Sequence, residues 1–385
     1  MEGSSSTAAS STARACPEEP APAAAATPPP IRACSWNVLA ESLLRGNSEL
    51  YRGCDPVGFE RRMERVVQGV LTLSPDIVAL QEVERFESDF ERPLSAAGYA
   101  GLYKKRTGGQ MDGVALFWKT ARFELRASEI IEYACHLSAG LPPAEAEKMR
   151  KHNVGIVATL TDLASGRALV VGTSHILWNP KRGLVKLRQM QYLIARADEA
   201  RARAAEEGAA VVLLGDFNCT PSSALYGFLL GGSLRGAVAD EGAWDGQKCQ
   251  QQQQKWVRSP QQMQKLRWEQ AQQPLKFVQH RQLASSSTSP PPPPGALPES
   301  HRLAGLLSSA YGSTGEPECS SYHSGFQGTV DYILHTRELG VVQLLPTPSR
   351  AQLAGRRSLP DAFCPSDHIA IAADLGWTPG MRAPI

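Results

Sequence analysis

Val211-Val-Leu-Leu-Gly-Asp-Phe-Asn218 joins an uninterrupted apolar run to a glycine, an acid and an amide. A short run of Val and Leu is typical of a strand buried on both faces of a sheet. A carboxylate at the end of such a strand must be hydrogen-bonded, ion-paired or bound to a metal ion. The stretch therefore predicts a central strand that ends in a polar site, although Asp216 and Asn218 could instead shape the turn before Thr220-Pro221.

Three further stretches place polar residues where an apolar strand ends or begins. Cys34-Ser-Trp-Asn37 ends in an amide, and Ile77-Val-Ala-Leu-Gln-Glu82 ends in a carboxylate. Ser366-Asp-His368 sets an acid beside an imidazole, just before the apolar run Ile369-Ala-Ile-Ala372. Several oxygen ligands that converge in this way suit Mg²⁺, which prefers carboxylates, amides and retained waters. The four stretches together predict a divalent metal site.

Each of these residues, taken alone, has a simpler interpretation. Glu82 could be the partner in a strand-end salt bridge, and Asn37 could be a turn or capping residue. His175 could be a hydrogen-bonded core histidine, and Asp331 an acid at a strand edge. Asp367-His368 could form either a catalytic pair or a helix cap. The metal-site interpretation depends on the whole set occurring together and in this order.

The apolar pattern predicts a mixture of helices and strands. Residues 57–73 carry apolar side chains at helical spacing, Ser74-Pro75 ends that helix, and 184–206 form a second, long helix. Short apolar runs predict strands at 31–39, 76–80, 112–118, 154–160, 168–174, 210–214, 329–334, 341–345 and 368–373. Because strands outnumber helices and do not alternate with them, the pattern favours an α/β sandwich of mixed sheets over a regular Rossmann array.

Size and composition limit the classes of protein that fit. The 385 residues, 42% of them hydrophobic, suffice for one large domain or two ordinary ones. The balance of 40 basic and 38 acidic residues excludes a polybasic DNA-coating protein but leaves room for a local basic groove. Its 8 cysteines are scattered without a Cys-x-x-Cys pair, which indicates a reduced, intracellular compartment. No apolar run is long enough to span a membrane.

Two segments have a biased composition. Residues 1–30 are mostly Ala, Ser, Thr and Pro, which predicts a disordered low-complexity tail, or a transit peptide for organelle import. Residues 245–300 are rich in Gln, Ser and Pro, which predicts a disordered surface insertion. Its basic residues, with Trp256 and Trp268, suit a loop that binds RNA or a protein partner, but an inert expansion is the simpler interpretation.

The ordered motifs resemble those of the endonuclease/exonuclease/phosphatase superfamily. They span nearly all of 31–375 and comprise Ser35-Trp-Asn37, Leu80-Gln-Glu82-Val83, Ser174-His175, Gly215-Asp216-Phe-Asn218, Val330-Asp331-Tyr-Ile333 and Pro365-Ser-Asp367-His368. Further motifs are similar to the deadenylase branch, which includes the carbon catabolite repressor deadenylases, nocturnin and Angel. The motifs most similar to Angel and its plant relatives are Tyr103-Lys-Lys-Arg106-Thr-Gly108, Asp112-Gly113, Asn179-Pro180-Lys-Arg-Gly183 and Lys186-Leu-Arg-Gln189.

The resemblance implies a fold and a set of metal ligands. The fold would be a DNase I-like catalytic domain over 31–385, interrupted by the 245–300 insertion. Its architecture would be a four-layer sandwich of two packed mixed β-sheets flanked by helices. Glu82 would be the main ligand of Mg²⁺, which Mn²⁺ can replace, with help from Asn37. Asp367 would bind a second ion or its waters.

The resemblance also implies catalytic roles. Asp216 would orient or deprotonate the attacking water, while Asn218 and His175 would hold the phosphate. His368 would contact a phosphate oxygen and stabilise the charge that develops there. Asp331 would pair with the imidazole of His368, raise its pKa and fix its orientation. No covalent nucleophile is needed for such a hydrolysis.

Four more residues are candidates for substrate binding. In the deadenylase branch a Phe and a Pro hold an adenine between them, and Phe326 and Pro180 resemble that pair. Asn179 and Arg106 would lie along the same groove, where a cation suits backbone phosphates. Phe326 could also be a core aromatic residue, and Arg106 could be ordinary solvated charge. Ser321 stands where poly(A)-specific members carry Asn, which argues against strict adenine selection.

The leading hypothesis is a Mg²⁺-dependent phosphodiesterase that shortens RNA from its 3′ end, as a poly(A)-directed exoribonuclease in mRNA turnover. The alternative is an enzyme acting on 2′,3′-cyclic phosphate ends, on 2′,5′-oligoadenylate or on a nucleotide cofactor. A non-catalytic RNA-binding protein is the third hypothesis, which the presence of Glu82, Asp216 and His368 disfavours. Without a leucine-rich-repeat region for scaffold docking, we expect a monomer that binds single-stranded RNA in the cytoplasm or nucleus.

Overall fold

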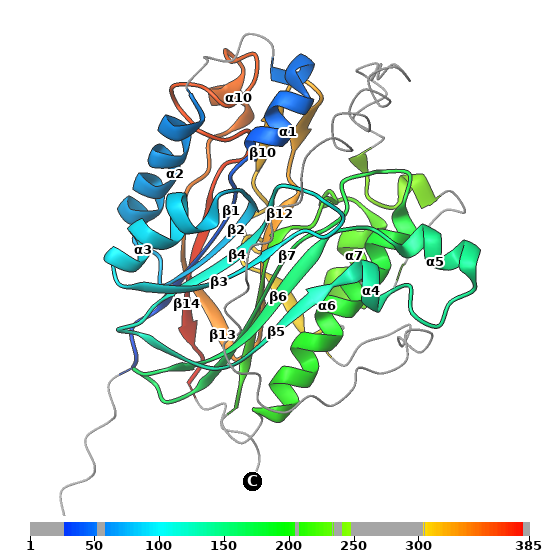
Figure 1. Cartoon of the computed structure of the whole chain (residues 1–385). Helices are drawn as coiled ribbons and strands as arrows, with labels where there is room; N and C mark the ends of the chain where they lie inside the picture. The colour runs from blue at the N-terminus through cyan, green and yellow to red at the C-terminus, as the bar shows by residue number, and fades with distance from the viewer. Residues whose placement is uncertain are drawn as a thin grey trace, which may run out of the picture.

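Two six-stranded mixed β-sheets form the centre of the molecule (Figure 1). The computed structural model describes residues 27–51, 58–204, 208–232, 234, 241–247, 303 and 305–379. The first sheet has the order β13 (Leu339–Leu344), β14 (Ile371–Trp377), β1 (Ile31–Asn37), β2 (Ile77–Val83), β4 (Gly113–Lys119), β3 (Tyr99–Lys105). The second has the order β5 (Phe123–Glu132), β6 (Val154–Asp162), β7 (Ala168–His175), β8 (Ala210–Asp216), β12 (Asp331–Thr336), β9 (Leu307–Ser309).

Each sheet contains a single parallel pair of neighbouring strands among those described. β1 runs parallel to β2 in the first sheet, and β7 runs parallel to β8 in the second. The other neighbours in both sheets are antiparallel. The carboxyl ends of two parallel strands lie at one edge of a sheet, so each sheet gathers the residues that end its parallel pair.

The two sheets pack face to face through side chains that alternate along each strand. In β8, Val212 and Leu214 belong to the core between the sheets, whereas Val211 and Leu213 face the helices outside. In β2, Ala79 is part of the core between the sheets, and its neighbours belong to the outer core. This alternation follows from the two-residue period of a strand, and it explains why strands buried on both faces are continuous apolar runs.

Helices cover the outer face of each sheet and complete four layers (Figure 1). α2 (Phe59–Leu73) and α3 (Arg92–Ala96) pack on the first sheet, and α6 (Gly183–Arg203) and α7 (Ala224–Gly231) on the second. The predicted mixed-sheet sandwich flanked by helices is thus confirmed. Shorter elements lie in the connections: α1 (Glu41–Gly46), η1 (Ser48–Tyr51), η2 (Glu87–Glu91), α4 (Tyr133–His136), α5 (Pro143–Met149), η4 (Glu241–Ala243), β10 (Ser321–His323), β11 (Phe326–Gly328) and α10 (Arg350–Leu353).

Some strands differ from those expected from the apolar pattern. β3 and β5 were not predicted, because both are edge strands and much of their length is half-buried or exposed. A register shift between Leu125 and Ala127 further breaks the alternation in β5. The strand expected at 368–373 begins only at Ile371, and His368 instead forms an isolated bridge with Ser321.

The segment before residue 248 is part of the packed domain. Asp245 and Gln247, which composition assigned to the insertion, are buried in it, with the Asp245 side chain fully covered. The rest of the predicted insertion, 248–300, and most of the predicted tail, 1–26, lie outside the described residues. Among the helices described, none combines the length and the apolarity that crossing a membrane requires.

Candidate functional site

The register of the second sheet brings three polar residues side by side. The parallel pairing of β7 with β8 aligns His175 with Asp216, where both strands end. The antiparallel pairing of β12 with β8 sets Asp331 opposite Asp216 on its other side. All three side chains are buried. Asp216, predicted to end a central strand in a polar site, therefore meets His175 and Asp331 at one edge of the sheet.

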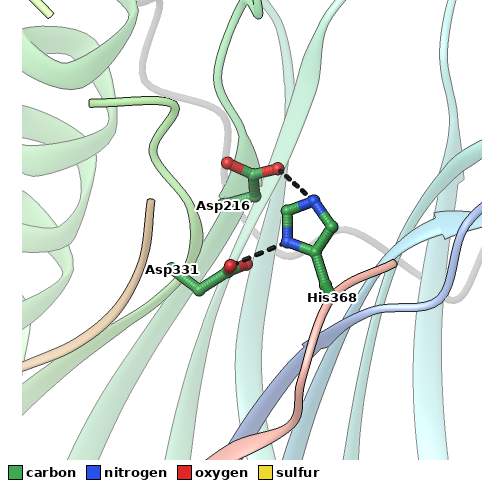
Figure 2. Close-up of side chains that lie close together, drawn as sticks. All are labelled: Asp216, Asp331 and His368. Carbon is green, nitrogen blue, oxygen red and sulfur yellow. Dashed lines mark hydrogen bonds and ion pairs between the residues drawn. The ribbon is translucent and has the colours of Figure 1, made fainter. Parts of the chain in front are cut away.

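His368 lies between two of these carboxylates (Figure 2). Its Nδ1 is 2.7 Å from Oδ2 of Asp331, and its Nε2 is 3.9 Å from Oδ2 of Asp216. Burial opposes a charge on the imidazole, but the carboxylate of Asp331 outweighs it, so the pKa of His368 is raised well above its usual value. The arrangement holds a positive charge between the acids.

The first sheet contributes Asn37 and Glu82 to the same cluster. Asn37 ends β1, and its Nδ2 donates to Oε1 of Glu82 at 2.9 Å and to Oδ2 of Asp216 at 3.1 Å. The backbone N–H of Ala40 donates to Oε2 of Glu82 at 3.0 Å. One amide group therefore joins a carboxylate of the first sheet to a carboxylate of the second.

Two of the site residues have left-handed backbone conformations. Glu82 has a φ of 59° and is the extra residue where the register of β2 shifts against β4, a β-bulge that redirects its side chain. Asn218 has a φ of 50°, a conformation that Asn tolerates better than most residues. Strained backbone that is held by its surroundings is a frequent property of functional sites.

Two acids of the cluster, Glu82 and Asp216, hold protons unusually tightly. Burial, together with the nearby Asp367, raises the pKa of Glu82 to about 8. Burial and the neighbouring Asp331 raise the pKa of Asp216 to about 7. Removing these protons leaves several buried negative charges close together, a state that a bound cation would stabilise. The donor set of carboxylates and an amide is the kind that Mg²⁺ prefers.

Three other atoms support a site that accepts a ligand. Oδ1 of Asp367, Oδ1 of Asp331 and Nδ1 of His175 are buried and have no hydrogen-bond partner within the part of the chain that the structure describes. Burial, and then the charge of Arg106, lowers the pKa of His175 well below its usual value, so its imidazole is neutral. A neutral imidazole and uncommitted carboxylate oxygens are available to an ion, a water or a phosphate.

Asn218 and Asp367 are held by specific partners. Nδ2 of Asn218 donates to the carbonyl of Ile176 at 2.9 Å, which commits one of its two N–H groups. Oδ2 of Asp367 accepts from the hydroxyl of Tyr51 at 2.8 Å. Both side chains are therefore ordered before any ligand arrives.

The candidate substrate-binding residues are only partly connected to this cluster. The Phe326 ring lies 6.4 Å from the ring of His323, which in turn lies 6.1 Å from that of Tyr51, the partner of Asp367. Arg106 is ion-paired with Asp112 at 3.2 Å, and its positive charge contributes to lowering the pKa of His175.

Asn179 and Pro180 lie in the turn that follows β7. Oδ1 of Asn179 accepts from the backbone N–H of Lys181 at 2.9 Å. None of the described contacts joins this turn to Phe326, so the predicted Phe–Pro pair stays a prediction.

Comparison with known proteins decides the family. The profile of the endonuclease/exonuclease/phosphatase family matches residues 34–368, a range that includes every residue of the cluster. The chain belongs to this family. As a member of the endonuclease/exonuclease/phosphatase family it is a phosphoric ester hydrolase of the metal-dependent type.

Relatives in this family include proteins of the predicted deadenylase branch. Carbon catabolite repressor protein 4 homolog 5 of Arabidopsis thaliana is 30% identical over 373 residues, covering 89% of this chain and 76% of the relative. Protein angel homolog 1 of Homo sapiens is 35% identical over 212 residues, covering 52% of this chain and 30% of that protein. The 2′,5′-phosphodiesterase 12 of Mus musculus is 27% identical, covering 90% of this chain and 52% of that protein.

Solved structures of this family agree with the fold. The crystal structure of ANGEL2, a 2′,3′-cyclic phosphatase, superposes with a TM-score of 0.69 at 27% identity, covering 90% of this chain and 95% of that one. The human nocturnin catalytic domain superposes with a TM-score of 0.58 at 20% identity, covering 91% and 96%, and supports the fold alone. The predicted resemblance to the deadenylase branch, with Angel and its plant relatives, is confirmed.

Several buried residues around the family site were assigned no role from the sequence. Arg62, on α2, donates to the carbonyls of Leu39 and Pro365, each at 2.8 Å, and so braces the loops beside Asn37 and Asp367. The signal for it in the sequence was its helical phase, since Arg62 lies three residues after Phe59 and four before Val66, on the apolar side. Lys186 and Gln247 each donate a hydrogen bond to the backbone carbonyl of Asn218.

Proposed function

We propose that this chain hydrolyses phosphodiester bonds at the 3′ end of RNA with the aid of a bound divalent cation. Its main activity would be that of a 3′-to-5′ exoribonuclease that accepts poly(A) ends and serves mRNA turnover. The observation that carries the proposal is the convergence of Glu82, Asp216 and His368, from separate elements, in one buried cluster. Buried acids and a cationic imidazole suit a reaction in which charge develops on phosphate oxygens.

Glu82 and Asp367 would hold the cation, and Asn37 would orient Glu82. Asn37 presents its amide nitrogen to the carboxylates, so in this geometry it positions Glu82 through a hydrogen bond. Oδ1 of Asp367 has no hydrogen-bond partner among the described residues and is available to an ion or its waters. Mg²⁺, with Mn²⁺ as a substitute, suits these oxygen donors. When bound, the cation would neutralise negative charge on the phosphate.

A second grouping, Asp216 with Asp331 and His368, has potential ligand atoms within 4.8 Å of one another. His368 uses Nδ1 on Asp331, however, and its raised pKa favours a protonated ring. A protonated imidazole cannot bind a metal ion. We therefore assign this grouping to charge stabilisation and the carboxylate of Glu82 to the cation.

The remaining residues would act on the water and the phosphate. Asp216, ionised when the cation is bound, would orient or deprotonate the attacking water. Asn218 would donate its second N–H to a phosphate oxygen, and the His368 imidazolium would stabilise the charge that develops there. His175, neutral and with Nδ1 uncommitted, would bind another phosphate oxygen. Asp331 would keep His368 charged and correctly oriented.

Recognition of the terminal nucleotide would involve Phe326 and the turn with Asn179 and Pro180. Phe326 belongs to an aromatic series that leads to Asp367 through His323 and Tyr51. A base stacked on an aromatic ring gains about 1–3 kcal/mol, whatever the base. Arg106, whose charge acts on His175, would hold a backbone phosphate.

A second candidate is the hydrolysis of a 2′,3′-cyclic phosphate at an RNA end. The similarity to ANGEL2, a 2′,3′-cyclic phosphatase, over 90% of this chain favours it. The similarity to 2′,5′-phosphodiesterase 12 shows that the family also includes enzymes for other linkages. The two candidates share the same metal-binding cluster and differ only in how the end of the RNA is held.

One experiment tests both candidates. Purified protein with Mg²⁺ is incubated with 5′-labelled RNAs of one sequence that end in oligo(A), in oligo(U) or in a 2′,3′-cyclic phosphate. We expect a ladder of shortened products from the oligo(A) RNA. Conversion of the cyclic end without shortening would favour the second candidate.

A matched pair of variants controls the assay. Glu82→Ala should abolish product formation, whereas Glu84→Ala, which removes a nearby acid that bonds to Ser42, should retain it. Product from the Glu82→Ala protein would overturn the metal assignment. Absence of product from every RNA, with Mg²⁺ or Mn²⁺, would overturn the proposed function.

A further inference from the structure

A fully buried lysine contacts the loop that follows Asp216. Lys186, in the first turn of α6, is 0% exposed, and its Nζ donates to the carbonyl of Asn218 at 2.8 Å. The same ammonium is ion-paired with Asp245, which is also 0% exposed. Burial lowers the pKa of Lys186, and the carboxylate of Asp245 opposes that shift. The ion pair therefore holds a positive charge at the backbone carbonyl of Asn218.

Gln247 contacts the same residue from a second direction. Its Nε2 donates to the carbonyl of Asn218 at 2.8 Å and lies 3.3 Å from Oδ1 of the Asn218 side chain. Two donors, from Lys186 and Gln247, therefore hold the carbonyl of a residue whose φ is 50°. A left-handed conformation persists only where the surroundings over-determine it.

Asp245 fixes both donors in place. Its Oδ1 accepts from the backbone N–H of Gln247 at 3.0 Å, and its Oδ2 bonds to Lys186. Its carbonyl accepts from the N–H of Thr220 at 2.8 Å, which attaches it to the chain just after Asn218. The three residues and Asn218 form one hydrogen-bonded unit with no exposed member.

We propose that Lys186, Asp245 and Gln247 are positioning residues that set the orientation of the Asn218 amide toward the phosphate. Oδ1 of that amide accepts from Nε2 of Gln247, and its Nδ2 donates to the carbonyl of Ile176. Because Oδ1 accepts one hydrogen bond and one N–H donates another, the direction in which the second N–H points is fixed. The inference rests on the proposed function, in which Asn218 binds a phosphate oxygen.

A purely structural role does not account for this choice of residues. Removing two charges from water is unfavourable, and apolar residues of similar volume often give equal or greater stability. A buried ion pair that bonds to a site residue is better explained by the geometry it imposes. Small displacements at a reacting group reduce rates strongly, so such geometry affects kcat more than stability.

A double-mutant cycle tests the inference with the full chain and Mg²⁺. Gln247→Met keeps the volume and removes both contacts that Nε2 of Gln247 makes with Asn218. We expect kcat on the best RNA substrate to fall about 10- to 100-fold with KM nearly unchanged, because the lost interaction acts on the transition state. In an Asn218→Ala background the same substitution should cause no further loss of kcat, because its effect passes through the Asn218 amide.

Two control variants separate positioning from folding. Gln191→Met replaces a buried glutamine on α6 whose side chain accepts from Arg188 at 3.1 Å, and it should leave kcat unchanged. Lys186→Met should lower kcat, whereas Arg196→Met, which breaks an ion pair farther along α6, should lower only the Tm. All Tm values are measured by calorimetry on the same samples.

The outcomes distinguish this inference from the proposed function. A wild-type protein that hydrolyses RNA while Gln247→Met keeps the wild-type kcat would overturn only the inference. Equal losses of kcat from Gln247→Met in the wild-type and Asn218→Ala backgrounds would also overturn it. A wild-type protein without activity on any of the three RNAs would overturn the proposed function and this inference with it.

Discussion

The carboxylates of Glu82 and Asp216 belong to different sheets, yet both accept hydrogen bonds from Nδ2 of Asn37, at 2.9 Å and 3.1 Å. One neutral amide cannot compensate two buried negative charges. Burial and the neighbouring acids accordingly raise the pKa of Glu82 to about 8 and that of Asp216 to about 7. The stability of the metal-free protein should therefore depend on pH through this pair.

The first prediction concerns Glu82→Gln in the absence of metal. Because the folded-state pKa of Glu82 is raised from 4.5 to about 8, its protonated form stabilises the fold below pH 4.5. That contribution is lost as the pH rises through about 8. Glutamine stays neutral, so the Tm of Glu82→Gln minus the Tm of wild type should increase by several degrees between about pH 5 and about pH 9. Calorimetry in EDTA measures both proteins, and a Tm difference independent of pH would contradict the assignment.

The second prediction is that a divalent cation stabilises the wild-type protein through Glu82. At a hundredfold excess over Kd, Mg²⁺ or Mn²⁺ should add about 2.7 kcal/mol to the free energy of unfolding. The effect should grow with pH, because the cation binds the ionised carboxylates. Glu82→Ala should lose the effect. Glu338→Gln, at a buried acid paired with Arg201, should keep it. An equal rise in Tm for Glu82→Ala would show that the cation binds elsewhere.

The third prediction concerns the pairing of His368 with Asp331 (Figure 2). Asp331→Asn removes the charge that raises the pKa of His368, so this pKa should fall. A neutral ring then stabilises less charge in the transition state, and kcat should drop by about 10²–10⁴-fold, as for other oriented imidazoles. The loss should be larger at high pH, where the imidazole of the variant is deprotonated.

NMR of ¹⁵N-labelled imidazoles follows this titration directly. Ser320→Ala removes only the hydroxyl that bonds to Oδ2 of Asp331 at 2.6 Å, and it should shift the titration less than Asp331→Asn does. A His368 resonance that titrates at the same pH in Asp331→Asn and wild type would mean that the carboxylate does not control the imidazole.

Those parts of the fold that depend on local pattern were predictable from the sequence. The apolar run before Asp216 is long enough for a strand and too short for a helix, and it is buried on both faces as expected. The helix ending at Ser74 was predicted from the following proline, and Ser74 adopts a left-handed φ of 47°. The edge strands β3 and β5 were missed because an exposed face weakens the apolar signal.

The site depended on long-range pairing that no local pattern contains. Asn37 and Glu82 were predicted at strand ends, but their hydrogen bond exists because β1 pairs in parallel with β2. Composition placed Gln247 in a low-complexity insertion, since a run of glutamines follows it. Its side chain is instead fixed by Asn218, far away in the sequence. Residues that act through tertiary contacts have no signal in their own neighbourhood.

The last prediction concerns Phe326 as a platform for the terminal base. If a base stacks on this ring, Phe326→Ala should lose about 1–3 kcal/mol of binding, which raises KM about 5- to 150-fold for RNA ending in oligo(A). The rate with bis(4-nitrophenyl) phosphate, which carries no base, should change little. Phe363→Ala removes an exposed ring that lies under Arg356, and it should leave both substrates unaffected. Because Phe326 is buried, its variant's Tm is measured as well. An equal loss of activity on both substrates would show that Phe326 supports the fold of the site and that the base binds elsewhere.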